Sequence, residues 1–147
     1  MAKLLETYKK KRKFNKTPEP KPVVKKTNLS RFVVQEHHAS HLHWDFRLEI
    51  DGVLKSWAVP KGVPEKPNIK RLAVQVEDHP VDYLFFEGKI PEGQYGAGTV
   101  KIWDQGNFKL YEQTPQLIDF ELSGKRLKGN YILIHTRANQ WIIFKKR

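Results

Sequence analysis

Residues 41–50 read HLHWDFRLEI, and they are followed by the turn dipeptide Asp51-Gly52 and by VLKSWAV at 53–59. Apolar and polar side chains alternate through the first segment, which is the two-residue period of a half-buried β-strand. Asp-Gly between two such runs is a strong hairpin signal, so the segments are predicted to pair antiparallel, with Arg47 opposite Ser56. Because the partners across the hairpin are small, its polar face is predicted to lie open above the sheet.

The polar face of this hairpin gathers the side chains that can carry chemistry. A period of two separates the apolar residues from the polar ones, and the apolar set must face the core. The apolar set is Leu42, Trp44, Phe46, Leu48 and Ile50, and the polar set is His41, His43, Asp45, Arg47 and Glu49.

A second segment, 71–80, repeats the alternation and ends at a proline. If this strand neighbours the first, its polar residues join the same polar surface. The set predicted to face the core is Leu72, Val74 and Val76, and the opposite set is Arg71, Ala73, Gln75, Glu77 and His79.

The remainder of the chain predicts an all-β fold with short helical pieces. Many short strands at regular spacing are typical of a barrel or a sandwich, and a small closed barrel is favoured because closure removes exposed strand edges. Turn dipeptides such as Lys61-Gly62, Gln105-Gly106, Ser123-Gly124 and Gly129-Asn130 separate the strands. The other predicted strands are 31–35, 99–104, 107–111, 117–122, 131–135 and 141–145.

Charge divides the chain into a basic arm, residues 1–27, and a barrel domain, residues 28–147. The chain has 147 residues and a formal net charge of +11, and the arm holds ten Lys or Arg against two Glu. Residues 4–14 could form a short basic helix, whereas the prolines between 17 and 22 favour extended backbone. Such an arm is typical of contact with a nucleic-acid backbone; the alternative is a solvated leader.

Composition excludes several classes of protein. The chain has no cysteine, so it has no disulfide, no cysteine-based zinc or iron–sulfur site and no cysteine nucleophile. We find no apolar run long enough for a membrane span and no signal peptide, and we therefore expect a cytoplasmic location with no membrane partner.

His43 and Asp45 lie two residues apart on one strand face, so both can lean onto a single ion. An imidazole and a carboxylate suit a divalent transition metal such as Mn²⁺, Fe²⁺ or Zn²⁺. His37, His38 or His41 could supply a third ligand from the preceding loop. The alternative is a stripe of surface ion pairs, which leaves the gathering of histidines unexplained.

Arg47 adds a constraint, because a guanidinium beside a divalent cation is repulsive unless an anion lies between them. A phosphate meets this need, since its oxygens can bridge the metal and accept the guanidinium fork. His79 and Tyr83 are spaced to act as an acid or a phosphate donor from an adjacent strand end.

These residues fall within motifs at 35–37, 43–49, 51–62, 71–80 and 83–88. Together they resemble the 3′-phosphoesterase domain that occurs at the N-terminus of bacterial DNA ligase D and as a stand-alone protein. The resemblance implies a β-barrel with a Mn²⁺-dependent site, for which Co²⁺ or Zn²⁺ are alternatives. It also implies removal of a 3′-terminal ribonucleoside from DNA, followed by hydrolysis of the resulting 3′-phosphate to a 3′-hydroxyl for end-joining repair.

The resemblance assigns roles position by position. The implied metal ligands are His37, His43 and Asp45, the phosphate contacts are Arg47 and His79, and Tyr83 is a further catalytic residue. Positions that support the site or the substrate are Gln35, Lys61, Arg71, Glu77, Arg12 and Glu19. The implied partners are DNA or RNA–DNA 3′ ends, with a separate DNA ligase and Ku as candidates.

The sequence departs from the family pattern at three positions near the site. His38 and His41 stand where relatives often carry Ala and Ser, and Trp44 stands where Tyr is common. The additional imidazoles offer a competing ligand set. The Lys-x-Asp-Gly motif of ligases is absent, so we expect no ligase activity in this chain.

Two other functions fit parts of the pattern. A His-x-Asp pair with a distant histidine is also the facial triad of non-haem iron oxygenases, with His135 as the distal ligand and Arg137 as a contact for 2-oxoglutarate. A non-catalytic nucleic-acid-binding module, in which the basic arm makes all contacts, is the second alternative.

Overall fold

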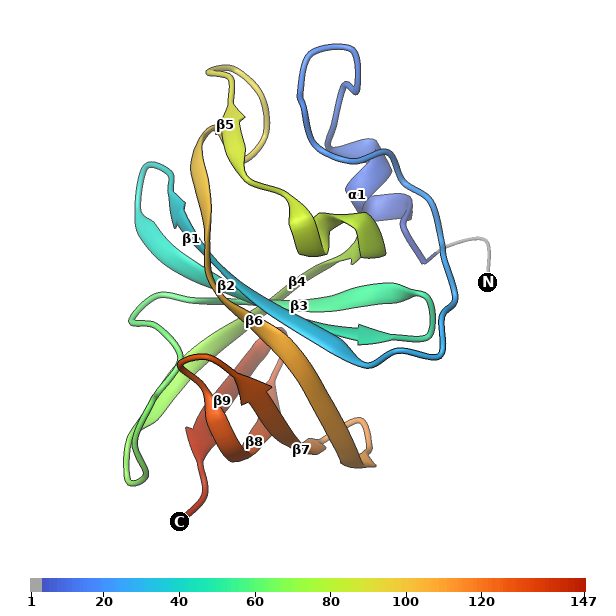
Figure 1. Cartoon of the computed structure of the whole chain (residues 1–147). Helices are drawn as coiled ribbons and strands as arrows, with labels where there is room; N and C mark the ends of the chain where they lie inside the picture. Colours follow the sequence, from blue (N-terminus) through green and yellow to red (C-terminus); the bar gives the residue numbers. More distant parts are fainter. Residues whose placement is uncertain (1–3) are drawn as a thin grey trace.

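The computed structural model describes residues 4–147, which form nine strands, eight of them closed into an antiparallel barrel (Figure 1). The barrel closes because β1 pairs with both β2 and β6, and β5 adds to β6 outside the closed ring. This confirms the predicted closed barrel. The strands are β1 (Arg31–His38), β2 (Leu42–Ile50), β3 (Val53–Val59), β4 (Lys70–Pro80), β5 (Gly88–Ile90), β6 (Gly98–Gln113), β7 (Leu117–Gly124), β8 (Lys128–Arg137) and β9 (Gln140–Lys145).

The β2–β3 hairpin has the predicted register. Arg47 lies opposite Ser56, and the turn residues Asp51 and Gly52 both have positive φ, of 56° and 85°. That pair of left-handed residues is what a tight two-residue hairpin requires, because its twist then matches the twist of the strands. The local sequence therefore fixes the spacing of the polar residues along β2.

Large apolar side chains fill the barrel interior, and many of them are aromatic. The rings of Phe46 and Phe120 pack with their centroids 5.8 Å apart, and Trp57 meets Trp141 at 5.7 Å. Leu42 was predicted to face the core but is 44% exposed, since it begins β2 at the open end of the barrel. The predicted core face of β2 is confirmed from Trp44 onward, since the partly buried Trp44 packs against the core cluster.

The prediction for the faces of β4 was wrong from Leu72 to Val76, because Val76 stands opposite Ser56 on the outer face. Ala73 is fully buried in the barrel interior, whereas Leu72 is 45% exposed on the outer surface. Between the pairs Leu54–His79 and Ser56–Val76, β3 advances by two positions and β4 by three, and this bulge reverses the alternation. Glu77 and His79 consequently do reach the outer face, where the chemistry was expected.

The predicted turn at Gln105-Gly106 is also wrong, because β6 runs through it as one long strand. A Cβ atom at Gly106 would stand 2.2 Å from the carbonyl oxygen of Ser123 on β7. Glycine is present there because the two backbones approach closely, and not because the chain turns. Gly129-Asn130 likewise lies within β8 and not between strands.

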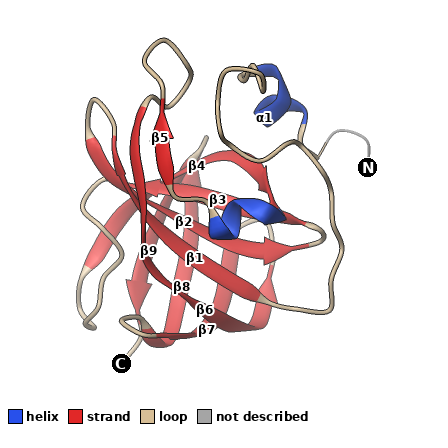
Figure 2. Ribbon diagram, turned by 45° about the horizontal axis from the view of Figure 1, so that its top comes forward, coloured by secondary structure: helices blue, strands red, loops and turns tan. Residues whose placement is uncertain are grey.

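The basic arm packs against the barrel (Figure 2). Helix α1 (Glu6–Lys10) and the short helix η1 (Val81–Phe85) cover the outer face of the first strands. Tyr8 is fully buried there, and its neighbours form a second apolar cluster outside the barrel. That cluster is Tyr8, Val33, Leu54, Val81, Tyr83, Leu84, Phe86, Ile90 and Val100.

Residues 4–27 therefore do not form a solvated leader. Besides the burial of Tyr8, Lys25 donates its backbone N–H to the carbonyl of Gly52.

Within the described part of the chain, neither short helix has the length or the apolar run needed to cross a membrane.

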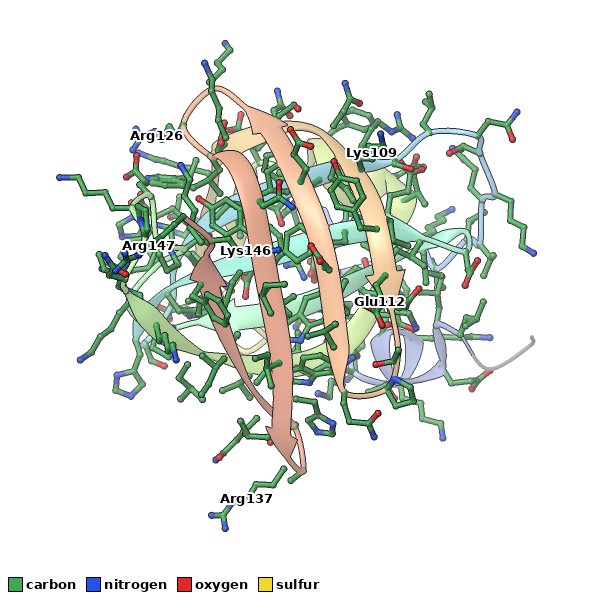
Figure 3. All side chains as sticks on the ribbon, turned by 90° about the horizontal axis from the view of Figure 1, so that it is seen from below. Lys109, Glu112, Arg126, Arg137, Lys146 and Arg147 are labelled. Carbon is green, nitrogen blue, oxygen red and sulfur yellow. The ribbon has the colours of Figure 1, made fainter. Side chains whose placement is uncertain are left out.

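The β8–β9 hairpin does not contribute to the polar face of β2. Three strands separate β8 from β2 in either direction around the barrel. His135 stacks on Trp141 with centroids 4.8 Å apart, and Figure 3 shows Arg137 projecting away from the barrel. The proposal of His135 as a distal metal ligand is therefore wrong.

Candidate metal and phosphate site

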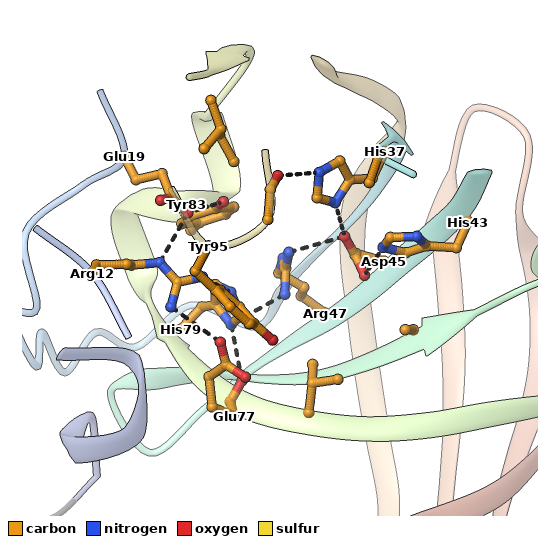
Figure 4. Close-up of a pocket in the computed structure, with 15 residues that line it drawn as sticks. Arg12, Glu19, His37, His43, Asp45, Arg47, Glu77, His79, Tyr83 and Tyr95 are labelled. Atoms are coloured by element: carbon orange, nitrogen blue, oxygen red, sulfur yellow. Dashed lines mark hydrogen bonds and ion pairs between the residues drawn. The ribbon is translucent and has the colours of Figure 1, made fainter. Parts of the chain in front are cut away.

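A pocket of about 310 Å³ lies on the outer face of the barrel, between β2, the bulged end of β4, the loop before β6 and the arm (Figure 4). Its lining brings together most of the predicted site residues and adds several that the sequence did not indicate. The lining comprises Arg12, Glu19, His37, Ala39, His43, Asp45, Arg47, Ala58, Val76, Glu77, His79, Tyr83, Ile90, Tyr95 and Gly96.

Three of these residues form a group able to hold a metal ion. His37 and His43 stand opposite each other on β1 and β2, and one ligand atom from each, with one from Asp45, lie within 4.8 Å of one another. The Asp45 carboxylate is shared: Oδ2 is 3.4 Å from His37 Nδ1, and Oδ1 is 3.2 Å from His43 Nε2. The candidate third ligand, His37, thus lies on the paired strand β1, whereas we had predicted that it would come from the preceding loop.

The outer nitrogens of both imidazoles are already engaged. His37 Nε2 lies 2.7 Å from the carbonyl oxygen of Gly96, and His43 Nδ1 lies 3.0 Å from that of His41. A carbonyl can only accept a hydrogen bond, so each of these nitrogens carries the proton. The nitrogens that face Asp45 can donate to its carboxylate, and a metal ion would displace those protons and bind the lone pairs, as in metal-ligating histidines.

His38 and His41 do not join this group. The His38 side chain is 47% exposed and pairs with Glu36, and His41 is exposed at the β1–β2 turn. Of the three histidines that were considered for the third ligand, the structure brings only His37 to Asp45.

Arg47 is buried beside the metal group, with 3% of its side chain exposed. Its Nη2 is 3.5 Å from Asp45 Oδ2, and its Nε donates to Gln35 Oε1 at 2.8 Å. Gln35 is itself held by the carbonyls of Tyr83 and Phe86, so the guanidinium is fixed before any substrate arrives.

The polar residues of β2 are therefore not a stripe of surface ion pairs, which was the alternative to a metal site. Asp45, Arg47 and Glu49 are all buried, although Glu49 pairs with Arg31 and does not line the pocket. Burial alone would raise the pKa of Asp45, but Arg47 and the two histidines hold it well below its usual value. Asp45 is an anion at neutral pH, as a metal ligand must be.

His79 faces Arg47 from the neighbouring bulge, with its Nδ1 3.2 Å from Arg47 Nη1. Burial lowers the pKa of His79 well below its usual value, and the guanidinium groups of Arg47 and Arg12 lower it further. The imidazole is therefore neutral at pH 7. Two positive groups and a neutral ring around one space favour an anion there.

The arm supplies a second buried guanidinium. Arg12 donates to Glu19 Oε2 at 3.0 Å and to Glu77 Oε2 at 3.1 Å, and its Nη2 lies 3.5 Å from His79 Nε2. Tyr83 donates to the same Glu19 oxygen at 2.6 Å, and burial raises its pKa well above the usual value. The phenol is consequently a hydrogen-bond donor and not a base.

Two predicted support residues lie away from the pocket lining. Lys61 is exposed, and Arg71 donates from Nη1 to the carbonyls of Lys61 and Gly62. These contacts hold the loop that follows β3.

Residue types and spacing did not indicate Tyr95 and Gly96, which line the pocket, or Tyr8, which packs on His79 and Tyr83. Only the tertiary fold brings these distant segments to β2, and the single local signal was the glycine-rich run at 93–98.

Residues 35–135 match the family of DNA Ligase D 3′-phosphoesterase domains. The chain belongs to this family. It is 49% identical over 158 residues to the multifunctional non-homologous end joining protein LigD of Pseudomonas aeruginosa, a match covering 99% of this chain and 19% of that protein. It is 44% identical over 160 residues to the protein of the same name from Mycolicibacterium smegmatis, covering 100% and 21%.

The multifunctional non-homologous end joining DNA repair protein LigD of Mycobacterium tuberculosis is 45% identical over 148 residues, covering 97% of this chain and 20% of that protein. The chain thus spans about a fifth of the length of these LigD relatives. The arm is included in the matched region of the relatives, although it precedes the residues that match the 3′-phosphoesterase family.

Proposed function

We propose that this domain is a divalent-cation-dependent phosphoesterase that acts on the 3′ ends of nucleic acids. It removes a 3′-terminal ribonucleoside to leave a 3′-phosphate, and it then hydrolyses that phosphate to a 3′-hydroxyl. The observation that carries the proposal is the buried Arg47 guanidinium beside the carboxylate that His37 and His43 share. The single charge of Asp45 does not balance a divalent cation together with the guanidinium, so a further anion is favoured beside them, and a phosphate can contact both.

The residues present fit a metal ion. His37, His43 and Asp45 would hold it, since the outer imidazole nitrogens donate to backbone carbonyls and leave the inner ones beside the carboxylate free to bind an ion. This donor set suits Mn²⁺, and Co²⁺ or Zn²⁺ as alternatives. When bound, the cation supplies Lewis-acid stabilisation of charge on a phosphoryl oxygen.

The chain's own residues orient the phosphate. Arg47 is held by Gln35 and presents its remaining N–H groups to the pocket, while Arg12 is held by two carboxylates on the opposite wall. Because both guanidinium groups are fixed in advance, they stabilise charge that develops on the phosphoryl oxygens without reorganising.

His79 is placed to move a proton. Its pKa is low while the two guanidinium groups face it alone, and an anion bound between them would offset their charge and raise that pKa. The ring can then protonate the leaving oxygen of the ester. Tyr83 stays protonated and keeps Glu19 and Arg12 in place.

Exposed lysines beside the pocket suit a nucleic-acid backbone. The docked arm, whose Arg12 and Glu19 line the pocket, has four exposed lysines. These are Lys9, Lys10, Lys13 and Lys16. Each phosphate that a lysine neutralises releases a counterion, so binding should weaken with salt. DNA or RNA–DNA ends are the proposed partners, in end-joining repair with a ligase and Ku, since the relatives carry that process in their names.

The test is a primer–template whose primer ends in one ribonucleotide, incubated with and without Mn²⁺. We expect stepwise conversion through a 3′-phosphate to a 3′-hydroxyl, with no product in chelator. Salt-sensitive binding with no product in any metal would instead indicate a non-catalytic binding module. Turnover that needs Fe²⁺, oxygen and 2-oxoglutarate would indicate an oxygenase, and either result would refute the proposal.

A further inference from the structure

We propose that Tyr95 is a stacking platform for the nucleobase next to the scissile phosphate. The inference rests on the proposed function, and it names the part of the substrate that the outer wall of the pocket recognises.

Tyr95 differs from the other aromatic residue of the pocket in its exposure. Tyr95 is 45% exposed, whereas Tyr83 is 2% exposed and uses its hydroxyl inside the site. Among the residues described as lining the pocket, Tyr95 is thus the aromatic ring that a ligand can cover. In the view of Figure 4, Tyr95 lies in front of the side chains of Arg12 and His79.

The backbone around Tyr95 is tied to the metal group. Its neighbour Gly96 accepts the His37 hydrogen bond, and turn hydrogen bonds from Gln94 to Pro91 and from Ala97 to Gln94 hold the loop. The ring is therefore placed relative to the reacting centre by a short and fixed connection. A platform for the adjacent nucleotide needs such a fixed position.

Cations of the arm hold the ring from one side. Lys11 Nζ donates to the Tyr95 hydroxyl at 3.2 Å and lies 4.5 Å from the ring centroid, and Arg12 Cζ lies 5.2 Å from the same centroid. These contacts reduce the ring's freedom while leaving nearly half of the residue accessible. Ordering the ring in advance lowers the entropy that binding must overcome.

The chemistry of the pocket assigns the base to this wall. The interior groups that surround Arg12 are committed to ion pairs, and the remaining interior groups suit a phosphate and a cation. A planar base is better placed against an exposed ring. Stacking accepts every base, because each has a π-face, and this suits an enzyme that must process ends of any sequence.

The test compares Tyr95→Leu and Tyr95→Phe on ends that contain or lack a base. One base-free substrate ends in 1-deoxyribose, which keeps the 2′-hydroxyl, and the other has 1,2-dideoxyribose at the penultimate position. Tyr111→Leu is the matched control, since Tyr111 is 48% exposed and lies outside the pocket lining.

On ends with all bases, we expect Tyr95→Leu to raise KM about tenfold, with Tyr95→Phe and Tyr111→Leu close to wild type. On one of the two base-free substrates, wild type and Tyr95→Leu should have the same KM. Mn²⁺ binding by Tyr95→Leu should be unchanged, because the substitution leaves His37, His43 and Asp45 in place.

An equal loss on both base-free substrates would show that Tyr95 acts through its loop, and a wild-type KM on every substrate would show no base contact. Either result would overturn the inference. Failure of the proposed function is a separate result, in which wild type cleaves none of these ends. Fluorescence anisotropy with the same oligonucleotides in Mn²⁺ would still test the stacking.

Discussion

The carboxylate of Glu77 accepts a hydrogen bond from Arg12 at 3.1 Å, and this contact ties the bulged end of β4 to the N-terminal arm. Both side chains are buried, with 4% and 3% exposed. Residues that are 65 positions apart in sequence thus form one wall of the pocket. The arm is part of the site, and its removal should affect chemistry as well as nucleic-acid binding.

Arg12→Ala should destabilise the fold and abolish turnover. It removes the guanidinium that Glu19 and Glu77 share, and losing one partner of a buried ion pair typically costs about 3–5 kcal/mol. Urea unfolding measures the change in the free energy of unfolding. Lys25→Ala is the matched control because Lys25 pairs with Asp82 at the surface, and a surface pair contributes about 0–1 kcal/mol. Equal effects of the two substitutions would contradict the buried network.

Stability should fall in acid partly through Glu77. Burial opposes its ionisation, but its backbone N–H, Arg12 and Lys11 hold the pKa of Glu77 below its usual 4.5. A carboxyl whose folded pKa is depressed contributes stability above the unfolded pKa, and this contribution is lost as pH falls through the folded pKa. Unfolding free energies from pH 7 downward should therefore fall less steeply below pH 4.5 for Glu77→Gln than for wild type. Parallel curves would show that Glu77 is not linked to folding.

Asp45→Ala and Arg47→Ala should fail for different reasons. Asp45→Ala removes the shared carboxylate, so both Mn²⁺ binding and the two hydrolytic steps should be lost. Arg47→Ala removes the proposed phosphate contact and keeps all three candidate ligands, so turnover should be lost while Mn²⁺ binding is largely kept. Calorimetric titration of Mn²⁺ together with product analysis separates these outcomes. Turnover by Asp45→Ala in metal-supplemented buffer would contradict the assignment.

Gly106→Ala tests the close approach of β6 and β7. The added methyl group would stand 2.2 Å from the Ser123 carbonyl, so the strands must shift, at a cost of about 1–3 kcal/mol. Gly93→Ala is the comparison, because its Cβ would meet nothing within 4 Å and only its φ of +86° carries strain. Thermal unfolding should place the Gly106 variant lower than the Gly93 variant, and the reverse order would exclude the steric explanation.

The sequence by itself determined the β2–β3 hairpin and the spacing of its polar residues. Alternation and an Asp-Gly turn are local properties, so they specified the register that places Arg47 opposite Ser56 and puts His43 and Asp45 on one face. The closed barrel also followed from local patterns, since many short strands in a small domain favour closure.

Tertiary structure alone decided which distant residues complete the site. The choice of His37 over His38 and His41 depended on how β1 pairs with β2, and the inward turn of Ala73 depended on a bulge that no local pattern marks. The docking of Arg12 and Tyr95 on the pocket depended on long-range burial and ion pairing. Periodicity reports the face on which a side chain lies, but it carries no information about which segments from elsewhere in the chain will cover that face.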